Sequence, residues 1–289
     1  DIMRKAVVII LTIFAFGSGL MAASDNQVYT KTIEFDGEKF LNVEMDFGMA
    51  ELKLARGTGD YIAKIRGEYD AEFFEVTINY EKKDGVGNLV VKIDEKKKSF
   101  TFDDSKSENN WEILLGDMVP MELMIDAGMC EADFDFSGLE ITGINMDIGM
   151  ASGSIIFTQP NKGRIKDFVI DAGKSSFECY GFGNANFENL VIDAGMASFD
   201  LDFSGKLAFD GKVELDAGMS SATIRLNPNM GTKIMYTEDW TSSVDMPSGF
   251  VKVRGGEYQT VDYDSQKGHL DFDIDISMGS VDFELAESL

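Results

Sequence analysis

A four-residue pattern, Asp-Ala-Gly-Met, recurs along this chain and limits what it can fold into. The pattern occurs both complete and in near copies. The aspartates that begin the copies are Asp46, Asp126, Asp147, Asp171, Asp193, Asp216 and Asp275. From Asp126 to Asp216, successive copies are 21, 24, 22 and 23 residues apart. Repeats of this length are typical of β-solenoids, in which each turn adds short strands to parallel sheets. The sequence therefore predicts an all-β, single-stranded β-solenoid with rungs of 21–24 residues.

Alignment of the copies on their aspartates indicates which side chains face inward. Apolar residues recur three and one positions before Asp, and one, six and eight positions after it. In one rung these residues are Leu190, Ile192, Ala194, Phe199 and Leu201. Because side chains alternate between the two faces of a strand, these columns are expected to stack as the core.

Two further columns describe a bend in each rung. The residue two after Asp is Gly in nearly every copy, and we expect it to form the bend with a positive φ. The residue four after Asp is always small, which predicts a tight corner. This corner column contains Cys130, Ala151, Ser175, Ala197 and Ser220.

The chain divides into three parts. Residues 1–23 have a positive start, an apolar run and a small-residue exit, which predicts a secretory signal peptide cleaved near Ala22 or Ala23. Residues 24–105 read as an N-terminal unit of short strands, and a charged loop separates them from the repeat array at 111–289. An insertion at 227–270 interrupts the array. Because an open solenoid end exposes unpaired strand edges, we expect the N-terminal unit and the insertion to cap the two ends.

Charge and targeting restrict the partners. The formal charge of −25 becomes −26 when Asp1, Arg4 and Lys5 leave with the signal peptide. So acidic a surface disfavours nucleic acid and anionic membranes as partners, and is compatible with cations or basic partners. No later stretch is long and apolar enough to be a transmembrane segment. The expected location is outside the cytoplasm: periplasmic, at the cell surface or secreted.

Two cysteines in an exported chain usually form a disulfide. Here the register argues against it. Cys130 falls in the corner column and Cys179 in a core column two rungs later. Rungs about 4.8 Å apart would separate them by roughly 10 Å, beyond the reach of a disulfide. The sequence predicts two buried free thiols.

A line of stacked carboxylates, here called the aspartate ladder, is the first candidate site. It contains Asp126, Asp147, Asp171, Asp193 and Asp216. Neighbouring carboxylates about 4.8 Å apart repel each other by roughly 1 kcal/mol even in water. One interpretation is structural, with each carboxylate accepting a hydrogen bond from its own turn as an Asx motif. The alternative is a shared row of cations such as calcium. We favour the structural interpretation and expect no metal or other cofactor.

A second candidate is the methionine ridge, three positions after each aspartate. It contains Met129, Met150, Met196 and Met219. Lys174 occupies the same position in the middle rung, so the column is expected to reach solvent. The ridge could serve as a soft interaction surface, since Met adapts to varied partners. We favour the simpler interpretation that each Met lies flat over the neighbouring corner.

Catalytic motifs are scarce. Outward acids such as Asp133 and Asp200 resemble the paired carboxylates of glycosidases, yet they lie three rungs apart. His269 is the only histidine, which argues against a His-based triad or a His-rich zinc site.

The array resembles the toast-rack or adhesin-like β-solenoid family of bacterial envelope proteins, which also supplies the C-terminal domain of LiaF-type cell-wall-stress regulators. The segment 41–52, Leu-Asn-Val-Glu-Met-Asp-Phe-Gly-Met-Ala-Glu-Leu, looks like the N-terminal strand pair of this family. Residues 111–113 and 120–123 look like its entry into the array. The resemblance covers residues 28–286, although this chain has Met where the family often has Ala or Gly.

The resemblance implies a fold and no catalytic residues. We therefore expect a non-enzymatic, exported β-solenoid that acts as an adhesin-like or cell-envelope-associated interaction module, with an envelope or extracellular protein or glycan as partner. The alternative is an extracellular polysaccharide-active β-helix enzyme. A groove with clustered acids, bases and aromatic residues on neighbouring rungs would favour that alternative.

Overall fold

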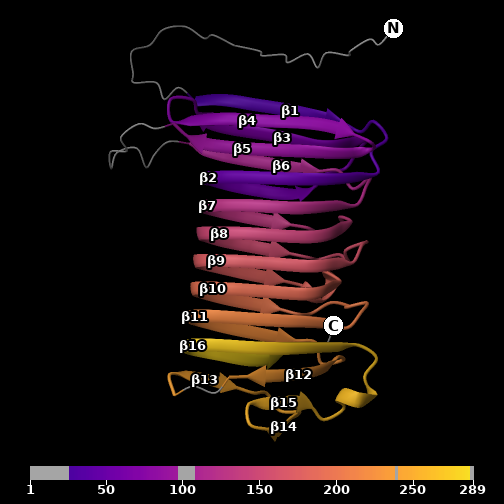
Figure 1. Cartoon of the computed structure of the whole chain (residues 1–289), viewed down its shortest axis with the longest axis vertical. Coiled ribbons are helices and arrows are strands. Elements are labelled where there is room, and N and C mark those ends of the chain that lie inside the picture. Colours follow the sequence, from indigo (N-terminus) through magenta and orange to yellow (C-terminus); the bar gives the residue numbers. More distant parts are fainter. Residues whose placement is uncertain (1–25, 97–107, 238–239, 287–289) are drawn as a thin grey trace.

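Seven long strands stacked in parallel form the body of the protein (Figure 1). The computed structural model describes residues 26–96, 108–237 and 240–286, so the expected signal peptide at 1–23 lies outside it. The stacked strands are β2 (Phe40–Arg56), β7 (Met121–Asp135), β8 (Ile141–Ile156), β9 (Ile165–Tyr180), β10 (Phe187–Asp202), β11 (Gly211–Leu226) and β16 (His269–Leu285). The prediction of an all-β solenoid is confirmed.

Each rung is one continuous strand with a bend, where the sequence suggested separate short strands. Alternation of side chains breaks at the bend: Asp193 points out, Ala194 in, Gly195 and Met196 both out, and Ala197 in. Two consecutive outward residues turn the strand so that both of its arms present their apolar side to the same interior. The first arm of each rung thus precedes the glycine, and the second arm follows it.

The role predicted for the bend glycines is wrong. The positive-φ glycines of the described chain do not include Gly128, Gly149, Gly173, Gly195 or Gly218. These glycines are required because the rungs stack closely. A Cβ atom at Gly149 would lie 2.6 Å from the carbonyl oxygen of Gly128, and one at Gly218 would lie 2.7 Å from that of Gly195. Glycine is therefore kept here by contact between backbones.

Asparagine side chains join the loops that close the rungs. Asn161 is buried; its Oδ1 accepts a hydrogen bond from the Ile141 amide at 2.8 Å, and its Nδ2 donates to the Ile141 carbonyl at 2.8 Å. One rung further on, Asn186 Nδ2 donates to the Asn161 carbonyl at 2.8 Å. These bonds satisfy backbone groups at the start of β8 and in the loop that follows it, and they join neighbouring rungs outside the two arms.

Both ends are capped by strands that pair in parallel with the end rung, and most of these carry antiparallel strands outside them. At the N-terminal end, β5 covers the first arm of β2 and β6 covers its second arm. Outside them, β4 pairs with β5 and β3 pairs with β6. β1 pairs with the free edge of β3. At the C-terminal end, β12 and β13 cover the two arms of β16, and β15 and β14 follow β12. The capping strands are β1 (Asn26–Glu34), β3 (Tyr61–Asp70), β4 (Phe74–Lys83), β5 (Val86–Glu95), β6 (Asn109–Leu115), β12 (Gly231–Tyr236), β13 (Ser242–Asp245), β14 (Phe250–Arg254) and β15 (Glu257–Thr260). Two short 3₁₀ helices, η2 (Phe182–Asn184) and η3 (Tyr263–Ser265), lie in loops.

Strand order at the C-terminal end differs from chain order. β16 lies between β11 and β12, although β12 comes earlier in the sequence (Figure 1). The first rung is likewise enclosed by later strands, since β2 lies between β7 on one side and β5 and β6 on the other. The expected N-terminal unit therefore contributes the first rung of the stack as well as its cap.

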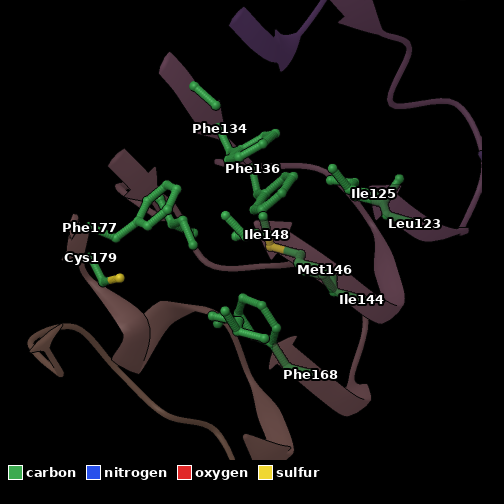
Figure 2. Packing of buried hydrophobic residues seen from close by; sticks show 14 of the residues in the cluster. Leu123, Ile125, Phe134, Phe136, Ile144, Met146, Ile148, Phe168, Phe177 and Cys179 are labelled. Atoms are coloured by element: carbon green, nitrogen blue, oxygen red, sulfur yellow. The ribbon is translucent and has the colours of Figure 1, made fainter. Parts of the chain in front are cut away.

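A single apolar core runs through the stack, with buried phenylalanines along it (Figure 2). The ring centroids of Phe136 and Phe157 are 5.5 Å apart, and those of Phe182 and Phe203 are 5.9 Å apart. The predicted inward columns are buried, as Ile192 and Leu201 show with no exposed surface.

The thiols of Cys130 and Cys179 are free and buried, as predicted. Burial raises the pKa of Cys130 to about 11, and burial also raises the pKa of Cys179. Because the thiolate is the reactive form, both should resist a thiol reagent at neutral pH while the protein is folded, and both should react once it is unfolded. Intact mass of the non-reduced protein before and after labelling checks this. A mass two protons lower in the unlabelled protein would contradict it.

Candidate functional site

The aspartate ladder is an unbroken line that crosses the whole stack. Register pairing joins Asp126 to Asp147, and then Asp147 to Asp171, through to Asp216. The structure extends the ladder at both ends, because Asp46 pairs with Asp126 and Asp275 pairs with Asp216. Seven carboxylates, about 4.8 Å from one rung to the next, thus lie on the outer side of the first arm, directly before the bend.

The Asx interpretation of the ladder is wrong. Within the described residues, no hydrogen bond reaches the six ladder carboxylates of Asp126, Asp147, Asp171, Asp193, Asp216 and Asp275, all of which are exposed. The strand runs on through the bend, so residues three and four positions after each Asp pair with the next rung. Among the residues that the structure describes, a cation is close to the ladder only at its N-terminal end, where Lys92 Nζ lies 3.7 Å from Asp46 Oδ2 and 2.7 Å from Glu44 Oε1. The ladder therefore carries largely uncompensated negative charge.

Electrostatic strain is evident at Asp126. Partial burial, followed by the Asp46 and Asp147 carboxylates, raises the pKa of Asp126, and Lys92 opposes this shift. A raised folded-state pKa means that ionised Asp126 destabilises the folded protein at neutral pH, and that protonating Asp126 relieves this cost. Within the described residues, no group of three or more ligating side chains has the arrangement of a metal site.

We expect the double substitution Asp171→Asn with Asp193→Asn to leave stability level or to raise it by up to about 1 kcal/mol, because it removes repulsion between adjacent rungs. Thermal melts at pH 7 and matched ionic strength, with calcium or with chelator, check this. A large calcium-dependent rise in the melting temperature of the unsubstituted protein, lost in the variant, would show instead that cations bridge the ladder.

The methionine ridge lies on the other side of the bend glycines. Met129, Met150, Met196 and Met219 are 42 to 53% exposed, so the column reaches solvent as expected. Lys174 is exposed in the same column, as expected. The bend therefore presents an apolar edge beside the acidic ladder.

A groove on the outer face of the first arms is the feature that sequence reasoning missed. It has a volume of about 570 Å³ and crosses β5, β2, β7, β8 and β9. It opens where Gly143 of β8 has no side chain between Glu122 and Asp167 of the adjoining rungs. A register shift at Met121/Glu122 gives β8 one extra residue, Thr142, whose hydroxyl donates to the Met121 carbonyl at 3.1 Å. Such bulges often reshape a surface at functional sites.

Two outward columns line the groove. In the rungs that the groove crosses, the residues four before the aspartates are polar except for Gly143, and those two before them alternate between polar and apolar. Outward lining residues are Asn42, Glu44, Asn88, Val90, Glu122, Met124, Asn145, Asp167 and Val169. The sequence signal for this groove was Gly143, which replaces a polar residue in its column. That glycine predicts a groove only if one already knows that the column four before the aspartates faces outward, beside the ladder.

Acidic residues on the second arm make structural contacts. The Arg225 guanidinium pairs with Asp200 through both terminal nitrogens, Nη2 lying 3.0 Å from Oδ2. Asp133 accepts a hydrogen bond from Ser154 Oγ at 2.7 Å, and Asp202 accepts one from the Ser204 amide at 2.7 Å. The two groups lie on β7 and β10, three rungs apart, and the structure brings them no closer.

His269 makes contacts between the last rung and the preceding loop. Its Nδ1 lies 3.3 Å from Asp210 Oδ1, and its Nε2 lies 3.1 Å from the Tyr263 carbonyl. The Tyr263 hydroxyl donates to Asp271 at 2.8 Å. Burial, followed by this hydrogen bond, raises the pKa of Tyr263. Both ring nitrogens of His269 therefore have partners within the protein.

Comparison with known proteins gives a family and similar folds. The family described as the N-terminal domain of toast_rack matches residues 22–180. A candidate cell adhesion protein of solved structure from Clostridium sporogenes is 20% identical, with a TM-score of 0.48, covering 90% of this chain and 100% of its own. A candidate adhesin from Bacteroides fragilis is 9% identical, with a TM-score of 0.36, covering 89% and 97% respectively. No curated protein matches the chain. Among the described residues, none forms a helix of the length and apolarity needed to cross a membrane.

Proposed function

The chain belongs to the toast-rack family of adhesin-like β-solenoids, and from this premise we propose that it is an exported, non-enzymatic interaction module of the cell envelope. The outer face of the first arms, comprising the groove and the aspartate ladder, is its binding surface. The observation that carries this proposal is the ladder. Carboxylates about 4.8 Å apart repel one another, and the described chain offers the six from Asp126 onward no hydrogen-bond partner. A row of like charges without partners in the fold favours a role outside the fold.

Export is supported by the N-terminal sequence. The positive start at Arg4 and Lys5, the apolar run that follows and the small residues up to Ala23 have the order of a cleavable signal peptide. The acidic composition fits an envelope partner with basic groups. We place the mature protein in the periplasm, at the cell surface or in the medium.

The absence of catalysis is part of the proposal, and the groove bears on it. Glu44 is paired with Lys92, and Glu122 and Asp167 lie on rungs β7 and β9 with Gly143 between them. Asp167 is also engaged, because its Oδ2 lies 4.0 Å from Lys166 Nζ and its Oδ1 accepts a hydrogen bond from Asn189 Nδ2 at 3.1 Å. Glu122 is then the one carboxylate among the groove's lining residues without a hydrogen-bond or salt-bridge partner, whereas a glycosidase needs a pair. The lining residues include no aromatic ring, the usual platform for a sugar. This arrangement favours binding over polysaccharide hydrolysis.

Export and envelope binding can be tested in one preparation. When the full chain is expressed in a bacterium, the mature protein should begin at residue 23 or 24 by intact mass and should leave the cytoplasm. The exported protein should then sediment with isolated bacterial envelopes. Met124→Ser, in the groove, should reduce the bound fraction at least fivefold, because Met124 is 56% exposed there. Met235→Ser on β12 is the matched control, since Met235 is 38% exposed outside the groove, and it should bind normally.

Three results would contradict the proposal. Retention of the uncleaved chain in the cytoplasm would show that it is not exported. Equal loss of binding in Met124→Ser and Met235→Ser would show that the groove is not the surface used. Release of new reducing ends from envelope polysaccharide, proportional to the protein added, would identify an enzyme.

A further inference from the structure

The groove has an apolar strip between two acidic borders. The strip is the column two before the aspartates on β2, β7, β8 and β9, continued by Val90 on β5. Val90, Met124 and Val169 give it apolar surface, and Glu44 and Asn145 alternate with them. Met124 is the most accessible of them, with 56% of its surface exposed. An exposed methionine in a groove adapts to varied apolar side chains.

The acidic borders run parallel to this strip. On one side, Glu122 and Asp167 lie two residues away along their strands. Lys166 Nζ lies 4.0 Å from Asp167 Oδ2, so Glu122 carries most of the uncompensated charge of this border. On the other side, two residues away in the opposite direction, lies the aspartate ladder at Asp126, Asp147 and Asp171. Two residues of a strand span about 7 Å, so both borders are within reach of a ligand seated on the strip.

Charge along the ladder is not uniform. Lys92 approaches Glu44 and Asp46 at the N-terminal end, so the negative charge there is partly neutralised. No cation is within salt-bridge distance of Asp126, Asp147 or Asp171 among the described residues. A ligand with positive groups beside an apolar face therefore gains most directly next to the groove.

The spacing of the ladder selects the shape of such a ligand. Two steps along the ladder, from Asp126 to Asp171, cover roughly 10 Å. In an α-helix, residues i and i+7 lie on one face and are about 10.5 Å apart. An extended peptide presents alternate side chains every 7 Å or so, which does not match steps of about 4.8 Å. A helix laid across the rungs can therefore place successive basic side chains against successive aspartates.

We propose that the groove and the adjoining ladder bind a cationic amphipathic α-helix of a partner protein. Its apolar residues contact Met124 and Val169, and its Lys or Arg residues pair with Asp126, Asp147 and Asp171. This is the helix-in-groove mode of recognition, with a charged border that fixes the orientation of the helix. The inference rests on the proposed function, because it names the chemistry of the partner at the same surface.

The test uses the purified exported protein and a labelled synthetic peptide of 18 residues or so, a length that gives a helix of about 27 Å. The peptide carries Leu on one helical face and Lys on both flanks. Fluorescence anisotropy should show saturable binding that weakens as salt is raised from low to physiological ionic strength. A peptide of the same composition with a scrambled order should bind at least tenfold more weakly.

Matched substitutions locate the site. Asp126→Asn with Asp147→Asn should weaken peptide binding at least tenfold, because both carboxylates border the groove. Asp216→Asn with Asp275→Asn removes the same charge from the same ladder on β11 and β16, away from the groove, and should change binding less than twofold. Melting curves should show that both pairs remain folded, since neither touches the core.

Three outcomes would overturn this inference. If the two double substitutions weaken peptide binding equally, or if the scrambled peptide binds as tightly as the helical one, the attraction is due to net charge alone. No binding of the helical peptide would also refute it. If envelope sedimentation still depends on Met124 in that case, the proposed function stands and the partner is of another kind. If the peptide binds and envelopes do not, the envelope role is the part that fails.

Discussion

Ile192→Asp is expected to lower the free energy of unfolding by about 5 kcal/mol or more. Ile192 is completely buried on β10, and its neighbours across the rungs are Ile170 and Leu215. The substitution removes most of the apolar burial of the side chain, and it also places a carboxylate where only apolar groups surround it. Urea unfolding followed by circular dichroism measures the effect.

The pH dependence of this variant has a definite sign. Burial raises the pKa of a carboxyl group, so the folded variant binds a proton more readily than the unfolded chain does. The deficit should therefore be largest at neutral pH and shrink as the pH is lowered through the raised pKa. A deficit that is the same at pH 5 and pH 7.5 would show that no carboxylate is buried.

Val191→Asp is the matched control for Ile192→Asp. Val191 is the preceding residue of the same strand and points outward with partial exposure. The new carboxylate would be hydrated there, and the cost should stay below about 1 kcal/mol. If both variants lose the same stability, the inward and outward columns are misassigned.

Gly149→Ala is expected to cost about 3 kcal/mol or more, because the added methyl group would lie 2.6 Å from the Gly128 carbonyl oxygen. Both atoms belong to the stacked backbones of β8 and β7, which cannot separate without breaking the ladder of hydrogen bonds between them. Thermal or urea unfolding measures the loss. A positive φ plays no part, so the cost arises from the neighbouring rung alone.

The same column supplies the control. Gly48 begins the stack, and a Cβ atom there would meet nothing closer than Glu95 Oε1 at 3.7 Å. Gly48→Ala should therefore be nearly neutral, or slightly stabilising because alanine has less freedom in the unfolded chain. Equal losses in Gly48→Ala and Gly149→Ala would mean that the bend itself, and not the stacking, requires glycine.

The sequence predicted the solenoid well because its information is repeated. A period of two within each strand and 21 to 24 residues between aspartates placed Ile192 and Leu201 in the core, and they are buried. The same alignment separated Cys130 from Cys179 and predicted free thiols, which the structure contains. Each conclusion follows from register alone.

Features that depend on contacts between rungs escaped prediction. The reason for the bend glycines is a distance between two backbones, which no single rung contains. The groove depends on one extra residue, Thr142, at the start of β8, where spacing counted from the aspartates cannot reveal a bulge. The sequence also could not predict whether the ladder carboxylates have hydrogen-bond partners. Asp-Ala-Gly-Met is compatible with an Asx turn, which would supply a partner, and with a continuous strand, which does not.

The position of β16 between β11 and β12 has a consequence for the order of folding. β12 and β13 are synthesised before β16, yet in the described chain β12 pairs only with β15 and β16, and β13 only with β16. Neither strand can join the stack until the last residues of the chain have left the ribosome or the export channel. The edge of β11 therefore stays open throughout synthesis, exposed to pairing with another chain. The cap closes in one late step. A chain truncated before His269 therefore keeps the unpaired edge of β11 and should form dimers or aggregates.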